Sequence, residues 1–373
     1  MKTLLPIVRD FPGKVYRGKV SKRGCSSDVY AMAIDITFQF CINGLRSDAF
    51  FHTFPMLSRR LCFGTLIIAV VIGLSWLDFS IYRYEWTKNI LWLPRGIILL
   101  PGYLVCLVLL TREVLRLLNA AGLHPLASSA YFGNLFIAIS CWIANIVQQY
   151  NLEVLGIPTS RGGWQWAATA SFTALLAVAG GVILAFAAEM RRYSHPGGVM
   201  INLAGAVFTF AYLGLLSCFM IQLHMAYGIG AILSLVIVTK MCDTGAYTFG
   251  KLFGRYRITP RLSPGKTLEG TIGGLFFACA GAWFWFDIVL PYPHFGFDKI
   301  PTPFLGWMLF GLAVALTGMV GDLAGSLIKR DSQMKDSGHA VPGFGGVLDI
   351  FDSILMAAPV AYVFWVFGFV CPG

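Results

Sequence analysis

A charged segment near the C-terminal end of the chain contains the residue types that bind metal ions and phosphate groups. It reads IKRDSQMKDSGHAVPGFGGVLDIFDS, from Ile328 to Ser353, in a chain that is otherwise mostly apolar. Asp349 and Asp352 stand three positions apart, so on a helix they would share one face. Carboxylate oxygens are the ligands that hard divalent cations prefer, and such sites often keep positions open for phosphates. We therefore predict a metal site formed by Asp322, Asp349 and Asp352.

A second segment, residues 242–274, is rich in glycine and basic residues. It reads CDTGAYTFGKLFGRYRITPRLSPGKTLEGTIGG. Glycine lets a backbone N–H group come close to an anion, and Lys and Arg supply the countercharge. The stretch SPGKT is not a Walker A motif, because Pro260 stands where that motif has its first glycine. We expect both segments to be loops that bind phosphates, although an ordinary basic loop would also explain the second.

The elements that must position these residues are membrane-spanning helices. The chain is 57% hydrophobic and 12% charged, whereas a soluble domain is about 25% charged. Its apolar stretches approach the length of a bilayer span and lack the alternation of a membrane barrel. We predict an all-α, polytopic integral membrane protein with nine transmembrane helices, and the boundary between the fifth and sixth near Gln222 and His224. The predicted spans are 61–78, 96–111, 130–147, 166–187, 200–221, 222–241, 270–290, 304–321 and 350–370.

The distribution of basic residues predicts the orientation in the membrane. The net charge is +10, and the loops after the even-numbered spans carry twelve Lys and Arg residues, whereas the opposite loops carry five. The positive-inside rule then places the N-terminus and both charged segments in the cytoplasm. Membrane topology explains this charge, so no nucleic-acid partner is expected. We predict a multi-pass protein of the cytoplasmic membrane, with an amphipathic helix at residues 111–123 on the cytoplasmic interface.

The first 55 residues differ from the rest of the chain. They contain no convincing span and no continuous apolar core of a signal peptide. The stretch MLSRRLCFGTLIIAV, which begins at Met56, has the form of a membrane-protein start: an initiator, a basic pair and a span. We predict an N-terminal extension at residues 1–55 and a membrane-embedded domain at residues 56–373. Translation from Met56 and a genuine cytoplasmic extension are both left open.

The charged segment reproduces a longer pattern with fixed gaps. This pattern resembles the signature of phosphatidate cytidylyltransferases, or CDP-diacylglycerol synthases, which runs S-x-x-K-R-x4-K-D-x-G-x-x-x-P-x-H-G-G-x-x-D-R-x-D. The stretches DTGAYTFGKLFG and SPGKTLEG resemble another region of the family, and the resemblance extends from residue 56 to the end. The matching residues are Ser326, Lys329, Arg330, Lys335, Asp336, Gly338, Pro342, Gly345, Gly346, Asp349 and Asp352.

The resemblance implies transfer of a cytidylyl group from CTP to phosphatidate, which gives CDP-diacylglycerol and diphosphate. It also implies Mg²⁺ as a cofactor, with a second cation left open, and membrane lipid as a partner; a homodimer is left open too. Such a reaction needs charge neutralisation and positioning more than a protein nucleophile. The predicted catalytic residues are Asp322, Lys329, Arg330, Lys335 and Asp336. The predicted substrate-binding residues are Asp243, Ser263, Lys266, Ser326, Lys329, Arg330, Gly345 and Gly346.

The chain departs from the family pattern at three positions. Phe344 stands in place of the family's His, and Ile350 in place of its Arg. Gly325 stands where a Glu is frequent in the family. No ionisable group remains at these positions, so the roles of that His and Arg are not transferred to this chain.

Three other functions are compatible with parts of this sequence. A CTP-dependent enzyme that acts on an isoprenoid lipid would share the broad architecture. A polytopic transporter would also have many spans, but its charges would lie near the middle of the membrane rather than at one face. A catalytically inactive scaffold would explain Phe344 and Ile350. The motif of CDP-alcohol phosphotransferases is absent from the sequence.

Overall fold

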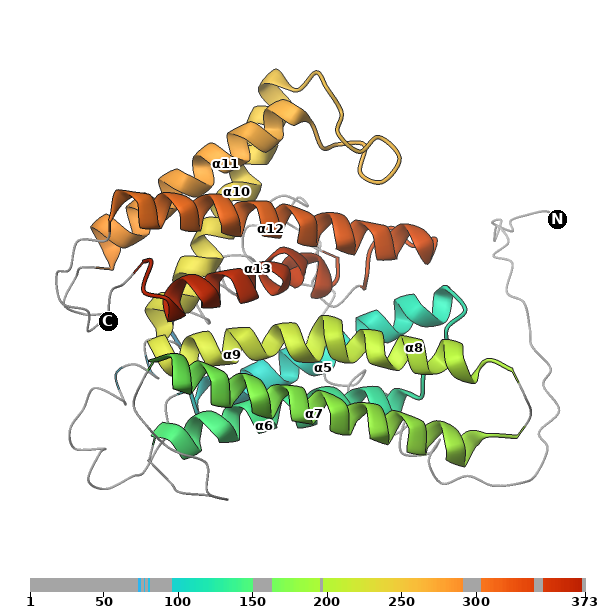
Figure 1. Ribbon diagram of the computed structural model, residues 1–373. Helices are drawn as coiled ribbons and strands as arrows, with labels where there is room; N and C mark the ends of the chain where they lie inside the picture. The colour runs from blue at the N-terminus through green and yellow to red at the C-terminus, as the bar shows by residue number, and fades with distance from the viewer. Residues whose placement is uncertain are drawn as a thin grey trace, which may run out of the picture. The chain divides into compact units, whose positions relative to one another are not determined.

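The computed structural model describes residues 73, 74, 77, 80, 96–149, 163–194, 197–290, 303–338 and 345–370 (Figure 1). All of them lie in one unit of the chain, Met56–Gly373. Within these residues the regular structure is helical, apart from one isolated bridge between Arg257 and Thr267. The predicted N-terminal extension, most of the span at 61–78, and Phe344 lie outside the described residues.

The described helices run in chain order from α5 to α13. They are α5 (Leu99–Ala120), α6 (Ala127–Gln149), α7 (Gly163–Arg192), α8 (Val199–Thr209), the π-helix η1 (Phe210–Leu215), α9 (Leu216–Tyr227), α10 (Ile229–Phe253), α11 (Leu268–Trp283), the π-helix η2 (Phe284–Val289), α12 (Phe304–Asp331) and α13 (Leu348–Val366). Helices α8, η1 and α9 form one uninterrupted rod, and so do α11 and η2.

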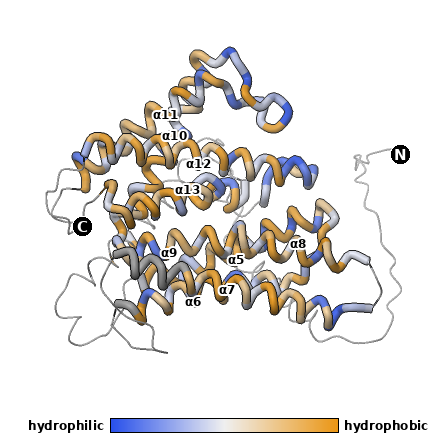
Figure 2. The backbone as a smooth tube through the Cα atoms, in the orientation of Figure 1, coloured by the Kyte–Doolittle hydropathy of each residue, from blue (hydrophilic) through white to orange (hydrophobic). Residues whose placement is uncertain are grey.

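Seven of the described helical stretches are long and apolar enough to cross a membrane. They are Ala127–Val147, Phe172–Arg192, Val199–Tyr227, Ile229–Phe253, Leu268–Val289, Phe304–Asp331 and Leu348–Val366. Figure 2 shows the apolar residues along these helices and hydrophilic ones at the α10–α11 loop and at the end of α12. The protein is therefore a membrane protein whose described part is all-helical, while the count of nine spans stays a prediction.

Gly228 separates the two helices that the sequence nearly fuses. Its φ of +77° lies in the left-handed region, which glycine adopts without the steric cost of a side chain. The boundary predicted near Gln222 and His224 is therefore wrong. Both residues are buried inside α9.

The second half of α5 is not the separate interfacial helix that was predicted at residues 111–123. Helix α5 continues without a break to Ala120. Glu113, Val114 and Leu117 are at most 5% exposed and lie inside the protein. The amphipathic pattern is real, but its apolar side packs against other helices rather than against lipid headgroups.

Most glycines of residues 242–274 serve helix packing rather than a loop. Residues 242–253 belong to α10 and residues 268–274 to α11. A Cβ on Gly245 would lie 2.7 Å from the carbonyl oxygen of Gly273, and a Cβ on Gly273 would collide with Phe249. Small residues of this kind let membrane helices approach closely. The predicted loop is thus limited to residues 254–267, and it contains Gly254 and Gly265.

Candidate active site

The predicted site residues come from three helices and two connecting segments. Asp322, Ser326 and Lys329 follow one another at helical spacing on one face of α12. Asp349 and Asp352 lie in the first turns of α13, and Asp243 lies on α10. The α10–α11 loop carries Ser263 and Lys266, and the segment between α12 and α13 carries Lys335, Asp336, Gly345 and Gly346.

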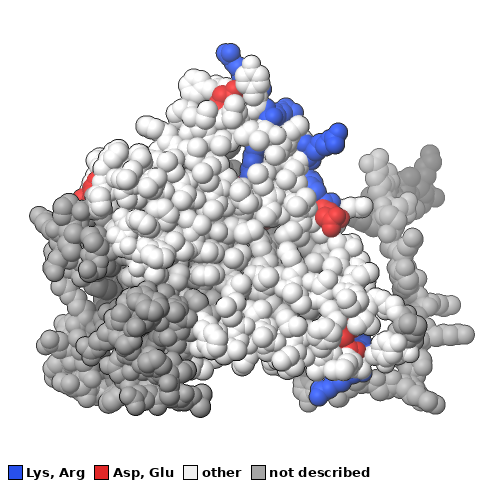
Figure 3. Space-filling view, in the orientation of Figure 1, with Lys and Arg blue, Asp and Glu red and all other residues white. Residues whose placement is uncertain are grey.

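Basic residues gather around the ends of these elements. Figure 3 shows Lys and Arg along one edge of the molecule, over the α10–α11 loop and the end of α12. Lys251, Arg255, Arg257, Arg261 and Arg330 are all exposed. Such a concentration of positive charge attracts anions such as phosphates.

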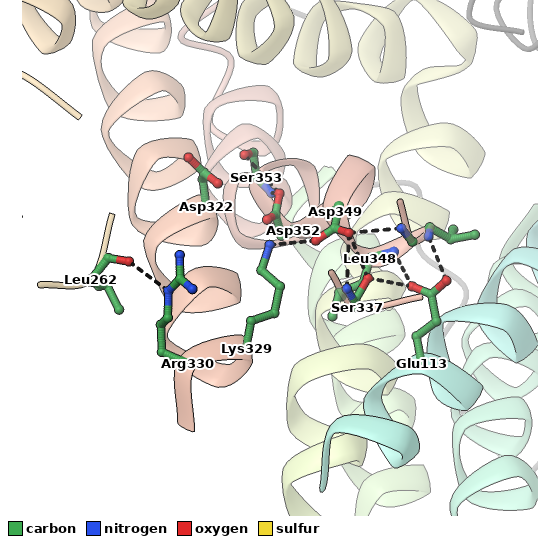
Figure 4. A network of polar contacts seen from close by, with 12 residues as sticks. Glu113, Leu262, Asp322, Lys329, Arg330, Ser337, Leu348, Asp349, Asp352 and Ser353 are labelled. Atoms are coloured by element: carbon green, nitrogen blue, oxygen red, sulfur yellow. Dashed lines mark hydrogen bonds and ion pairs between the residues drawn. The ribbon is translucent and has the colours of Figure 1, made fainter. Parts of the chain in front are cut away.

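An ion pair between Lys329 and Asp349 joins α12 to α13 (Figure 4). Lys329 Nζ lies 2.6 Å from Asp349 Oδ1, and the two side chains are only 16% and 15% exposed. The other carboxylate oxygen, Oδ2, accepts hydrogen bonds from the backbone N–H of Gly346 at 2.9 Å and from Ser337. Both oxygens of Asp349 therefore already bind protein donors.

A second ion pair joins the α10–α11 loop to α12. Lys266 Nζ lies 2.7 Å from Asp322 Oδ2 and 3.4 Å from the carbonyl oxygen of Met319. The Arg330 Nε–H adds a contact of 3.5 Å to the carbonyl oxygen of Leu262. The sequence places these segments far apart, and the two contacts bring the loop to the acidic end of the site.

The loop itself is a small hairpin with internal bonds. Ile258 N–H donates to the carbonyl oxygen of Lys266, and Leu268 N–H donates to that of Tyr256. The carboxylate of Glu269 accepts from the backbone N–H groups of Arg255 and Tyr256. These hydrogen bonds fix the backbone position of Lys266, and with it the origin of its side chain.

Asp352 on α13 lies near Asp322 on α12 (Figure 4). Asp352 is 3% exposed, and its Oδ1 accepts a hydrogen bond of 2.6 Å from the Ser353 backbone N–H. A Cβ on Gly325 would lie 2.7 Å from Asp352 Oδ2. The glycine that replaces the family's Glu thus makes room for this acid.

The acid pair fits a divalent cation that also binds substrate phosphates. Mg²⁺ is commonly held by one or two carboxylates together with phosphate oxygens rather than by a cage of protein ligands. Among the described residues, no group of three or more His, Cys, Asp and Glu is arranged to hold a metal ion. Asp322 uses one oxygen for its pair with Lys266, and Asp352 forms no ion pair within the described part of the chain, so these two can supply ligands. Both oxygens of Asp349 already bind protein donors.

The structure brings some predicted residues into contact and leaves others apart. Asp243 is exposed and pairs with Lys240 at 3.0 Å, and Lys240 Nζ also donates to the carbonyl oxygen of Ile350 on α13. Lys335 and Asp336 are exposed beside the site. Gly345 has a φ of +94°, so this position requires a residue without a side chain.

The sequence analysis missed Glu113 of α5. It is 5% exposed, and its carboxylate accepts hydrogen bonds from Ser337, Val347 and Leu348 at the start of α13 (Figure 4). The stretch LLTREVLRLL gave little signal, because Glu113 stands beside Arg112 and three residues before Arg116, as in an ordinary ion pair on a helix surface.

Comparisons of the sequence with known proteins identify its family. A sequence model described as the cytidylyltransferase family matches residues 49–367. Phosphatidate cytidylyltransferase of Staphylococcus aureus (strain COL) is 30% identical over 220 residues, which are 58% of this chain and 77% of that protein. The enzymes of the same name from Bacillus subtilis and Haemophilus influenzae are each 35% identical, over 40% and 38% of this chain and 54% and 47% of their own lengths. The chain belongs to the cytidylyltransferase family.

Proposed function

We propose that this protein transfers the cytidylyl group of CTP to phosphatidate and forms CDP-diacylglycerol and diphosphate. The observation that carries the proposal is the convergence of two lysine–aspartate pairs, Lys329–Asp349 and Lys266–Asp322, at the charged end of apolar helices. A polar phosphate-binding site at the end of membrane helices suits a water-soluble nucleotide and a lipid headgroup. The family and the names of the relatives support the same reaction.

The reaction is an in-line displacement at phosphorus. A phosphate oxygen of phosphatidate forms a bond to the α-phosphorus of CTP, and the bond from that phosphorus to the diphosphate oxygen breaks. The substrates carry many negative charges, so Lys266, Lys329 and Arg330 lower the barrier by neutralising them and fixing their positions. Lys335 lies on the exposed segment beside these cations and would meet the outer phosphates.

The protein would hold Mg²⁺ through Asp322 and Asp352. A bound Mg²⁺ supplies charge neutralisation and polarises phosphoryl oxygens. Lys266 pairs with Asp322, so its ammonium lies beside the proposed cation ligands, where it would bind a substrate phosphate. The oxygens of Asp349 contact Lys329, Ser337 and Gly346, so a role for Asp349 as a third ligand stays a prediction. A second cation stays a prediction too.

The charged end of the helices faces the cytoplasm in this proposal. The Lys and Arg residues of the α10–α11 loop and the α12 end support that orientation through the positive-inside rule. CTP is available on that side. The protein would be a multi-pass protein of the cytoplasmic membrane, and its association as a homodimer stays a prediction.

The lipid substrate can be tested by competition between lipid classes. Purified protein in detergent is mixed with CTP, Mg²⁺ and either phosphatidate, an isoprenoid phosphate or a polyprenol, and the lipid products are identified by mass spectrometry. We expect CDP-diacylglycerol from phosphatidate and little product from the other two lipids. A product from an isoprenoid lipid alone would assign the site to a different enzyme, and counterflow transport of a solute without nucleotide turnover would favour a transporter.

A further inference from the structure

A buried glutamate of α5 reaches the segment that carries the candidate active site. Glu113 is 5% exposed, and a carboxylate at such a position is costly unless it is fully hydrogen-bonded. Both of its oxygens accept hydrogen bonds, from the Ser337 hydroxyl and from the backbone N–H groups of Val347 and Leu348. A residue of the N-terminal half of the chain therefore makes its strongest contacts with the C-terminal site.

Glu113 caps the start of α13. The backbone N–H of Val347 donates to Glu113 Oε1 at 2.9 Å, and that of Leu348 donates to Oε2 at 2.8 Å. The first N–H groups of a helix lack partners inside the helix, and α13 has no capping side chain of its own. A negative charge here also interacts favourably with the positive end of the helix dipole.

Ser337 connects this cap to the Lys329–Asp349 pair. Ser337 Oγ lies 2.9 Å from Glu113 Oε2 and 3.1 Å from Asp349 Oδ2, and the side chain is fully buried. Its single hydroxyl proton thus lies between two carboxylates. Asp349 in turn contacts Lys329 at 2.6 Å, so four side chains form a continuous series from α5 to α12 (Figure 4).

Two glycines of the site leave room for Glu113. A Cβ on Gly338 would collide with Glu113 Oε1 and lie 2.8 Å from its Cδ, and a Cβ on Gly346 would collide with Glu113 Oε2 and Ser337 Oγ. The φ angles of Gly338 and Gly346 are not in the left-handed region, in contrast to that of Gly345. Close approach, rather than backbone conformation, therefore requires glycine at these two positions.

From these contacts we infer that Glu113 is a positioning residue for the reaction. It holds the start of α13 and Ser337, and through them it fixes the Asp349 carboxylate and the Lys329 ammonium in their reactive geometry. Glu113 itself does not touch a substrate. The inference rests on the proposed function, because it assigns Lys329 to substrate phosphates.

The test compares Glu113→Gln with Glu189→Gln. The amide of Gln keeps the size of the side chain but replaces one acceptor oxygen with a donor, which would face either Val347 N–H or Leu348 N–H. Glu189, on α7, is a matched control because it is also a buried carboxylate, at 6% exposure, on another helix of the N-terminal half. Initial rates of CDP-diacylglycerol formation give kcat and KM for CTP and for phosphatidate, and unfolding in detergent gives Tm.

We expect Glu113→Gln to lower kcat about 100-fold, the loss that a displacement of about 1 Å can cause. The KM values should stay within about threefold of those of the unmodified protein, because a misplaced reactive group lowers transition-state binding more than substrate binding. Glu189→Gln should leave kcat within about threefold. If the unmodified protein forms no CDP-diacylglycerol, the proposed function fails. If the unmodified protein is active, two results would overturn the positioning role. In the first, Glu113→Gln has the kcat of the unmodified protein. In the second, its kcat falls only as much as its Tm does, and Glu189→Gln shows the same fall in Tm.

Two further variants keep the inference testable if Glu113→Gln does not fold. Ser337→Ala leaves both backbone caps of α13 and removes only the hydroxyl that lies between Glu113 and Asp349, so kcat should fall about tenfold with Tm nearly unchanged. Gly338→Ala should reduce kcat in the unmodified protein but add little in a Glu113→Ala background, since the collision is then gone. Full activity of Ser337→Ala, or independent losses in the double variant, would contradict the inference.

Discussion

Lys329 and Lys251 illustrate how differently two lysines of the same basic face can be placed. Lys329 is 16% exposed and pairs with Asp349 between two helices. Lys251 is exposed on α10, and its ammonium lies 5.7 Å from the centre of the Tyr247 ring. Lys329 thus has one defined position near the acids, whereas Lys251 contributes mainly to the positive charge of this side of the membrane.

Replacing these two lysines should distinguish a lysine that acts in the reaction from one that only adds positive charge to the cytoplasmic side. Lys329→Ala removes a preorganised positive group and should lower kcat about 100-fold or more. It also leaves Asp349 without its ion-pair partner. Lys251→Ala should change kcat by less than about threefold, as expected for an exposed surface charge. Equal losses of CDP-diacylglycerol synthesis in both variants would remove the distinction.

The acid pair Asp322 and Asp352 should behave as one unit. Asp322→Asn and Asp352→Asn keep the size of each side chain but remove a charge that attracts a divalent cation. Each variant should lose about 100-fold or more in kcat, and the double variant should be little worse, because groups that act together are not additive. The measurement is initial rate against Mg²⁺ concentration.

Asp287→Asn on η2 provides the control for the acid pair, since this residue lies on a different helix from either acid. Tm in detergent shows whether each protein is folded. Near-normal activity of both single variants of the pair would exclude it as the cation site and would favour Asp349 and Asp336.

At the scale of elements, the sequence located the helices better than it located their ends. The apolar stretches correctly predicted α6 to α13 as helices, but α10 runs to Phe253 and α12 to Asp331. Residues 242–253 and 322–331 are rich in glycine and charged residues, a composition that is typical of loops. They are helical because glycines pack against a neighbouring helix and the charges lie where α12 reaches polar surroundings.

The contact between α12 and α13 can be tested with two glycines of α12. A Cβ on Gly321 would lie 2.5 Å from the carbonyl oxygen of Asp352 and 2.9 Å from Met356 Cβ. A Cβ on Gly318 would make only ordinary contacts, at 3.6 Å or more. Gly321→Ala should therefore destabilise the protein by about 1–3 kcal/mol through overpacking.

Gly318→Ala is the matched substitution and should leave Tm nearly unchanged or raise it slightly. Thermal unfolding in detergent measures both variants, and the activity of Gly321→Ala should fall with its stability. A Tm for Gly321→Ala equal to that of the unmodified protein would show that the two helices are not packed as closely as described.

At the scale of the whole molecule, contacts between distant parts of the chain were beyond sequence reasoning. The signature contains both Lys329 and Asp349, and the structure joins these two residues by an ion pair. No local pattern relates Glu113 to Leu348, since the two residues are separated by 235 positions and meet only when α5 packs beside α13. The same holds for Lys266 and Asp322, which the α10–α11 hairpin brings together.

The orientation of the molecule predicts which positions reagents can reach from outside the cell. Single cysteines at Arg261 and Gln333, both exposed at the charged end, should not react with an impermeant thiol reagent in intact cells. A cysteine at Leu305, 58% exposed at the opposite end of α12, should react. The native cysteines are replaced beforehand. Labelling of Arg261→Cys or Gln333→Cys from outside would reverse the proposed topology.

The most direct test of the central claim follows the phosphorus atoms of CTP. Purified protein is incubated with phosphatidate, Mg²⁺ and CTP labelled either at the α- or at the γ-phosphate, and the label in the lipid fraction is counted. Because the α-phosphorus is the reacting atom in cytidylyl transfer, we predict that α-label enters the lipid and γ-label leaves as diphosphate. Transfer of γ-label to the lipid would identify a kinase, and the absence of both labels from the lipid would contradict the account.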